Sequence, residues 1–173
     1  MSNSLKPDRE ISGSPPHNFK FIADAMLGRL ARWLRFLGFD VLYHRDISDL
    51  GLIRIAREQD RYILTRDTRL VKRKGIKYFL LIHSDDPFQQ LAEVLDTLNL
   101  KRYELLSRCV KCNGLLTRVA DKQEIGGSVP EYVFLHFPVF MKCSDCGRIY
   151  WKGTHPEKFI SNLRDILNVE KDC

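Results

Sequence analysis

The sequence predicts an α/β protein in which a parallel β-sheet is flanked by helices and followed by a small metal-binding module. Short apolar runs alternate with helix-like segments between residues 19 and 100, two of these runs lead into an aspartate, and two CxxC pairs lie beyond residue 100. Strands that alternate with helices of this length are typical of βαβ units and a mainly parallel sheet. We therefore expect a flexible polar tail over residues 1–18, an α/β domain over 19–100, and a metal-binding module with a C-terminal helix over 101–173.

The elements of the α/β domain can be assigned in chain order from apolar periodicity and turn residues. Strands are predicted over residues 19–24, 39–44, 62–65 and 77–83, and helices over 25–37, 48–59, 67–74 and 87–98. Gly38 suits the turn after the first helix, and Ser48 or Asp49 the N-cap of the second. Asp86, followed by Pro87, has the form of an N-cap for the last helix. Right-handed crossovers then gather the loops that follow the strands at one edge of the sheet.

Length and composition limit the class of protein. A chain of 173 residues, 44% of them hydrophobic, can hold one or two domains with a normal core. No apolar run approaches the roughly 20 residues needed to span a bilayer, and residues 1–18 have no pattern of a targeting peptide. We therefore expect a cytoplasmic protein without a membrane segment, whose cysteines are reduced or bound to metal.

The positive charge is concentrated in one part of the chain. Residues 19–75 carry 13 Lys/Arg against 7 Asp/Glu, whereas residues 1–18 and 76–173 are each balanced. Such an excess attracts polyanions, with an affinity that falls as salt rises. A net charge of +6 alone is also compatible with an ordinary solvated surface.

Two groups of basic residues account for this excess. On the first helix, at 100° per residue, the leucines fall within about 80° and the arginines within about 120° on the other side. The arginines are Arg29, Arg32 and Arg35, and a second group comprises Arg66, Arg69, Lys72, Arg73 and Lys74. We expect both groups to contact phosphates, although a solvated helix face would give the same pattern.

Two aspartates are candidate catalytic residues because each closes an apolar strand. Asp24 follows residues 21–23 and Asp67 follows residues 62–66. Ligands of open α/β sheets bind beyond the carboxyl ends of the strands, so both carboxylates are expected to reach one site. Carboxylates in a basic protein indicate hard metal ions and a phosphate-bearing substrate. An aspartate at a strand-to-helix junction is also a common helix N-cap, which is the alternative for each residue alone.

Two CxxC pairs predict a structural zinc site. Cys109 and Cys112 form the first pair, Cys143 and Cys146 the second, and the 30 residues between the pairs require an insertion. Four thiolates can close a tetrahedron at Zn–S distances of about 2.3 Å and leave no open coordination position. The redox alternative requires a CxxC pair on a thioredoxin-like βαβ unit, and neither pair lies on one.

The chain also resembles a known family over about residues 19–165. The stretches that carry the likeness are residues 24–35, 37–40, 64–70 and 143–155. They resemble the PIN-like RNase domain family with a zinc ribbon, found at the C-terminal end of the Mut-seven exonuclease and as stand-alone prokaryotic proteins. The resemblance implies a PIN-like nuclease domain joined to a zinc ribbon, with RNA as the partner and substrate.

The resemblance also implies a set of site residues. PIN-like sites gather three or four acids around one or two Mg²⁺ or Mn²⁺ ions, and hydrolyse phosphodiester bonds there. Carried over by position, these acids are Asp24, Asp49 and Asp67, with Asp46 as the nearby substitute for Asp49. No fourth carboxylate is assigned, and the basic residues named above are expected to bind the RNA backbone.

A nucleic-acid-binding or ribosome-associated module with weak or no catalysis is the alternative function. The two functions differ in what they require of Asp49. Convergence of Asp24, Asp49 and Asp67 on one point favours catalysis, whereas an Asp49 that points away favours binding.

Overall fold

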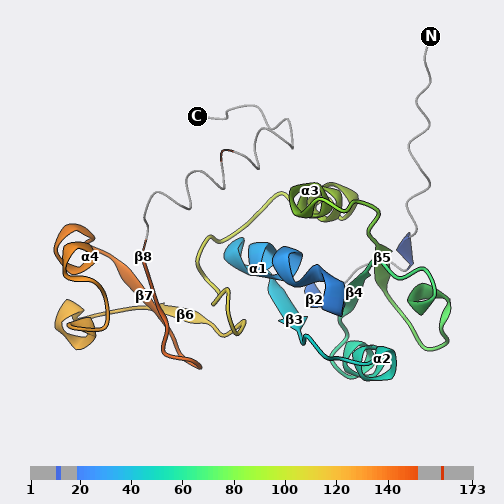
Figure 1. Ribbon diagram of the computed structural model, residues 1–173, viewed down its shortest axis with the longest axis horizontal. Coiled ribbons are helices and arrows are strands. Elements are labelled where there is room, and N and C mark those ends of the chain that lie inside the picture. The colour runs from blue at the N-terminus through green and yellow to red at the C-terminus, as the bar shows by residue number, and fades with distance from the viewer. Residues whose placement is uncertain (1–10, 13–18, 152–160, 162–173) are drawn as a thin grey trace, which may run out of the picture.

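The computed structural model describes residues 11–12, 19–151 and 161, and the structural statements below concern these residues. They form two sheets, one mainly parallel with helices on both faces and one small and antiparallel (Figure 1). The α/β fold class predicted from the sequence is confirmed. The C-terminal helix that the sequence suggested lies outside the described residues. No helix in the described part of the chain is long and apolar enough to cross a membrane.

The larger sheet has the strand order β1-β5-β4-β2-β3. Its parallel strands are β2 (Lys20–Ala23), β3 (Asp40–Tyr43), β4 (Tyr62–Thr65) and β5 (Phe79–Leu81). The edge strand β1 (Ile11–Ser12) pairs antiparallel with β5, so these two residues are part of the sheet and not of the expected tail. Because β2 and β4 are neighbours, the residues that follow them lie side by side.

Helices cover both faces of this sheet. The helices are α1 (Gly28–Phe36), α2 (Asp49–Glu58) and α3 (Pro87–Thr97). Helices α1 and α3 pack with Phe21 and Leu64 on one face, and α2 packs with Ile22 and Ile63 on the other. Successive strand residues point to opposite faces, which is why consecutive residues in the middle of β2 and β4 are apolar. Figure 1 shows α3 and α2 on opposite sides of the strands.

The predicted helices over 67–74 and 25–37 and the predicted strand over 77–83 are each shorter in the structure. The segment 67–74 contains only a 3₁₀ turn, η2 (Leu70–Lys72), because Leu70 is its one buried residue and supplies little apolar surface to hold a helix. Another 3₁₀ turn, η1 (Ala25–Leu27), precedes α1 and is capped by Asp24. The cap of α2 is Ser48, whose hydroxyl accepts from the amide of Gly51, so Asp49 is free of the capping role.

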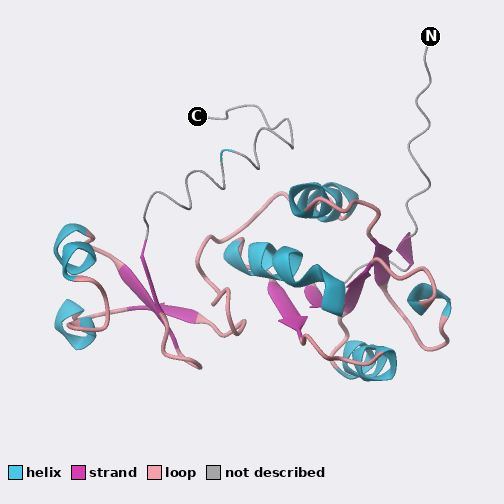
Figure 2. Ribbon diagram, viewed as in Figure 1, coloured by secondary structure: helices cyan, strands magenta, loops and turns pink. Residues whose placement is uncertain are grey.

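The smaller sheet contains β6 (Leu116–Arg118), β7 (Phe140–Cys143) and β8 (Ile149–Trp151), all antiparallel. The insertion expected between the CxxC pairs contains η3 (Lys122–Ile125) and α4 (Glu131–His136), and Figure 2 shows these two short helices beyond one end of the strands. The small sheet lies on the α1 side of the molecule, away from β1.

Candidate active site and metal centre

Asp24 lies where β2 ends, at the carboxyl edge of the parallel sheet. Its amide donates to the carbonyl of Leu64 in β4 (2.9 Å), which fixes the backbone against the neighbouring strand. One carboxylate oxygen accepts from the amide of Ala25 (2.6 Å), so Asp24 does cap the turn η1. The other oxygen accepts from the hydroxyl of Thr65 (2.7 Å). The capping role thus uses one oxygen, and the second is directed towards the end of β4.

Thr65 connects the two candidate aspartates. It is completely buried at the end of β4, and its hydroxyl both donates to Asp24 and accepts from the amide of Asp67 (3.0 Å). One carboxylate oxygen of Asp67 accepts from the amide of Arg69 (2.7 Å). Thr65 was not among the site residues predicted from the sequence. The signal available was a polar residue closing an otherwise apolar strand two positions before an aspartate.

The two remaining acids do not join this pair. A carboxylate oxygen of Asp49, at the start of α2, lies 2.9 Å from a guanidinium nitrogen of Arg73, and both side chains are half exposed. Asp46 is exposed in the loop after β3. Within the described residues, no third carboxylate comes close enough to Asp24 and Asp67 to complete a metal-binding group.

The predicted phosphate-binding residues have several environments. Arg29, Arg32, Arg69, Lys72 and Lys74 are exposed, as phosphate contact requires. Arg66 forms an ion pair with Asp85, and Arg73 forms the pair with Asp49. Arg35 differs from the expectation for the basic face of α1, because only 5% of it is exposed.

Arg35 fixes the first CxxC pair to the α/β domain. Its Nε donates to the carbonyl of Val41 in β3 (2.8 Å), and one Nη donates to the carbonyls of Val110 (3.3 Å) and Lys111 (3.0 Å). Asn113 adds a second link, since its side-chain oxygen accepts from the amide of Val41 (2.9 Å). The turn that carries Cys109 and Cys112 is therefore held against α1 and β3, and the buried guanidinium of Arg35 does not lie on the exposed face that was expected for phosphate contact.

The four cysteines form the one group of three or more potential metal ligands found among the described residues. All four Sγ atoms lie within 4.8 Å of one another, with 3.6 Å between Cys109 and Cys146 and 3.4 Å between Cys112 and Cys143. Sulfurs at the corners of a tetrahedron with Zn–S bonds of about 2.3 Å are about 3.8 Å apart. The cluster thus has the spacing of a four-thiolate metal site, as predicted.

The acidities of the thiols differ because the four sulfurs lie close together. Burial opposes ionisation of Cys109, but hydrogen bonds from the hydroxyl of Tyr150 (3.0 Å) and from the amides of Cys112 and Lys111 lower its pKa to about 6. Burial and the neighbouring sulfurs raise the pKa of Cys112 to about 12. Once one thiolate has formed, the others resist ionisation, and a bound cation removes this resistance.

The close approach of the two cysteine turns depends on Gly114. A Cβ on this residue would clash with the carboxylate of Asp145 and would lie 3.0 Å from the sulfur of Cys143. In the second turn, Gly147 has a φ of 68°, in the left-handed region that favours glycine. Gly114 therefore allows the two turns to approach closely, and Gly147 adopts a backbone conformation that glycine favours.

The similarity to known proteins covers most of the chain and agrees with the family resemblance seen in the sequence. The model of the Mut7-C RNAse domain family matches residues 19–163. Exonuclease mut-7 of Caenorhabditis elegans is 30% identical over 127 residues, which cover 65% of this chain and 14% of that protein. The match thus spans about one seventh of the length of this relative.

Proposed function

We propose that this chain, which belongs to the Mut7-C RNase domain family, is a metal-dependent ribonuclease that hydrolyses phosphodiester bonds at the carboxyl edge of its parallel sheet. The observation that carries the proposal is the link from Asp24 through Thr65 to Asp67. It couples two acids on neighbouring strands at the edge where α/β sheets bind their ligands.

The catalytic metal would be held by Asp24 and Asp67. Mg²⁺ and related cations are commonly bound by one or two carboxylates together with waters and substrate phosphates, so this pair is a sufficient set of protein ligands. Asp49 would become a third ligand if its ion pair with Arg73 opened. Arg73 could then bind a substrate phosphate. A bound divalent cation supplies an activated water and offsets the charge on the leaving oxygen.

In the proposed reaction, side chains of the protein position the metal-binding carboxylates and neutralise the charge of the RNA backbone. Thr65 holds the Asp24 carboxylate in one orientation, which limits the reorganisation required when a cation binds. The exposed cations Arg69, Lys72 and Lys74 follow Asp67 directly in the chain, where they can bind the RNA backbone without reading bases.

The four-cysteine cluster would hold a structural zinc ion. Thiolates in this spacing suit Zn²⁺, and a site with four protein sulfurs has no position for a substrate or a water. The ion would join the β6–β8 sheet to the turn that Arg35 fixes on α1.

A cleavage assay tests this proposal. Mixed single-stranded RNA and DNA of the same sequence should be incubated with the protein and Mg²⁺, Mn²⁺ or excess EDTA. We expect RNA cleavage with either metal and none with EDTA. Equal cleavage in EDTA would contradict the metal requirement, and preferential cleavage of DNA would contradict the assignment as a ribonuclease.

The second candidate function is RNA binding without catalysis, and the Asp49–Arg73 ion pair favours it. This pair keeps the third acid away from Asp24 and Asp67 in the structure. Strong, salt-dependent RNA binding without cleavage under any metal condition would establish this function instead.

A further inference from the structure

A cavity of about 690 Å³ lies between α1 and the cysteine module, on a part of the surface that the proposed active site does not use. Five side chains define its character: Arg32 of α1, Lys111 of the first cysteine turn, Lys142 of β7, Arg148 of the second cysteine turn and Tyr150 of β8. Its volume lies within the range of about 300–1,000 Å³ that is typical of ligand sites. The cavity is thus large enough for part of a polymer strand and is shared by both halves of the molecule.

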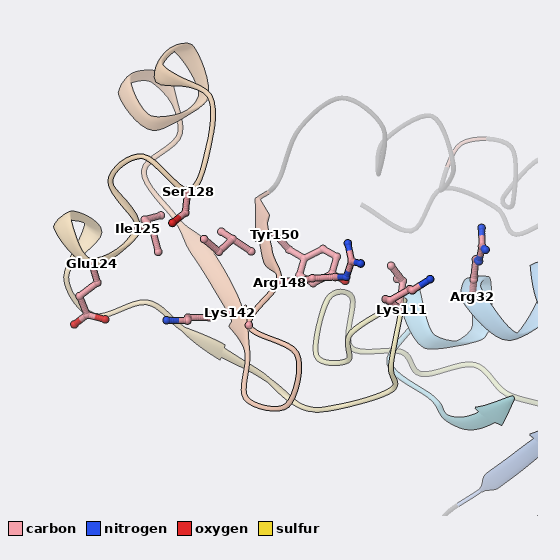
Figure 3. A pocket seen from close by; sticks show the side chains of 11 residues that line it. Arg32, Lys111, Glu124, Ile125, Ser128, Lys142, Arg148 and Tyr150 are labelled. Carbon is pink, nitrogen blue, oxygen red and sulfur yellow. The ribbon is translucent and has the colours of Figure 1, made fainter. Parts of the chain in front are cut away.

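The charge of this cavity is unbalanced. Four cations line it against one acid, Glu124. Figure 3 shows Arg32, Lys111 and Arg148 on the side facing α1, with Glu124 at the opposite end. Among the residues that the structure describes, none of these three cations has an ion-pair partner, in contrast to Arg66 and Arg73. Three unpaired cations around one hollow favour a polyanionic ligand.

The residues that line the cavity stand on a rigid frame. Arg35 holds the backbone of Val110 and Lys111 against α1, and the hydroxyl of Tyr150 is 3.0 Å from the sulfur of Cys109. The ring of Tyr150, partly exposed in the cavity, therefore has a fixed orientation next to Arg148. Aromatic rings combined with a cationic groove are typical of surfaces that bind single-stranded nucleic acid.

A simpler role for Lys111 and Arg148 is to offset the negative charge of four thiolates. It does not account for Arg32, which belongs to α1 and has no hydrogen bond or ion pair with the cysteines among the described residues. It predicts that removing Lys111 or Arg148 weakens metal binding, whereas a role in ligand binding predicts unchanged metal content.

We propose that this cavity binds the sugar-phosphate backbone of single-stranded RNA, so that a strand cleaved at the sheet edge is also held between α1 and the cysteine module. This inference rests on the proposed function for the identity of the polymer. It adds a second contact region, and therefore a dependence of binding and cleavage on strand length.

The test uses the full chain carrying Arg32→Gln, Lys111→Gln and Arg148→Gln together, and fluorescence anisotropy with a labelled RNA of about 16 nucleotides. Each phosphate contact contributes about 0.7 to the salt slope of single-strand binding, so the triple variant should lower the slope by about 2. Between 50 and 200 mM salt, the affinity advantage of the parent over the variant should therefore shrink by about 20-fold. The matched control replaces Lys20, Lys101 and Arg102 by Gln, three exposed cations that line a different cavity.

Cleavage provides an independent readout. The triple variant should lose the parent's preference for cleaving a strand of about 16 nucleotides over a strand of about 4. The inference is overturned if the control variant lowers the slope equally, if the triple variant leaves it unchanged, or if the triple variant loses metal. Failure of the parent to cleave any RNA contradicts the proposed function alone, because the anisotropy experiment still tests the cavity.

Discussion

The parallel sheet carries carboxylates at both ends, and their surroundings are opposite. At the amino end, Asp40 opens β3 and accepts hydrogen bonds from Arg61 (2.7 Å) and Asn113 (2.8 Å), with Arg108 at 3.6 Å. At the carboxyl end, Asp24 accepts only from a hydroxyl and an amide among the described residues. Aspartates on adjacent strands of one sheet therefore have different electrostatic partners.

This difference separates a carboxylate that stabilises the fold from the two carboxylates proposed to bind a metal ion. Burial alone would raise the pKa of Asp40, but the hydrogen bonds from Arg61 and Asn113 and the charges of Arg61 and Arg108 lower it below its usual value. A carboxylate neutralised in this way has no need of a metal ion. At the other end, Asp24 has no ion pair among the described residues, and Asp67 has only the exposed Arg69, at 3.8 Å, so these two carboxylates can accept a metal ion. Asp49 and Asp85 at the same end are paired with Arg73 and Arg66. The groups that contact each aspartate, and not the residue type, therefore indicate its role.

The largest expected effect is that of replacing a cysteine, because the amino end of the parallel sheet is held against the turn that carries Cys109 and Cys112. Cys112→Ser or Cys146→Ser should abolish metal binding and unfold the β6–β8 sheet, since structural zinc contributes about 10–16 kcal/mol of apparent binding free energy. The measurement is metal analysis of purified protein, with about one equivalent of zinc expected in the parent and none in the variants. Metal-free parent protein with native circular dichroism, or a disulfide within either pair, would contradict this prediction.

The second largest expected effect concerns Asp40, the carboxylate at the amino end of the parallel sheet. Asp40→Ala leaves the buried guanidinium of Arg61 without its carboxylate, and we expect a loss of about 3 kcal/mol in the free energy of unfolding. Urea unfolding followed by circular dichroism measures it. Asp46→Ala is the matched control, because this exposed residue should change stability by less than about 0.5 kcal/mol. Equal losses of stability from Asp40→Ala and Asp46→Ala would contradict a stabilising role of the Asp40–Arg61 pair.

The carboxyl end should show the reverse pattern, with activity lost and stability kept. Asp24→Asn or Asp67→Asn should lower the cleavage rate by at least about 100-fold, since residues that only support metal ligands already give 10- to 100-fold losses. Asn caps helices as well as Asp does, so the thermal midpoint should stay near that of the parent.

Rates at saturating Mn²⁺ and melting curves of the same samples check this prediction. Asp86→Asn, which changes a cap far from the proposed site in the chain, is the control and should retain full activity. An Asp24 variant that cleaves like the parent would return Asp24 to the role of a cap.

Much of this arrangement could be predicted from the sequence because it depends on local patterns. The alternation of strands and helices, the cap at Asp86 and the cysteine cluster follow from periodicity, turn chemistry and ligand spacing within short segments. The position of Asp24 and Asp67 at one edge follows from the rule for parallel sheets.

The remainder depends on contacts between distant segments. The spacing of residues on α1 predicts which side chains face away from the sheet. It does not predict that the turn at residues 110–113 covers Arg35. The hydroxyl of Thr65 links Asp24 and Asp67 only after β2 and β4 have paired. Asp49 kept its predicted position at the start of α2 but acquired a partner, Arg73, from a segment expected to be helical.

The smallest expected effect is a change in the pH dependence of stability at the amino end. The folded-state pKa of Asp40 lies below its unfolded value of about 3.9, so its contribution to stability is complete above that value and is lost as pH falls through the folded pKa. Asp40→Asn removes this contribution, and the variant should lose less stability than the parent as the pH is lowered from about 5 to 2.

Arg61→Gln should give part of this flattening, because it removes one hydrogen bond and one charge that lower the pKa of Asp40, whereas Asn113 and Arg108 remain. Thermal melts of the parent, the two single variants and the double variant over this pH range measure the coupling. If Arg61 acts on Asp40 and on no other acid, the double variant should have the acid dependence of Asp40→Asn alone. Additive flattening would mean that Arg61 acts on another acid, and that the neutralised carboxylate at the amino end is not maintained by this pair.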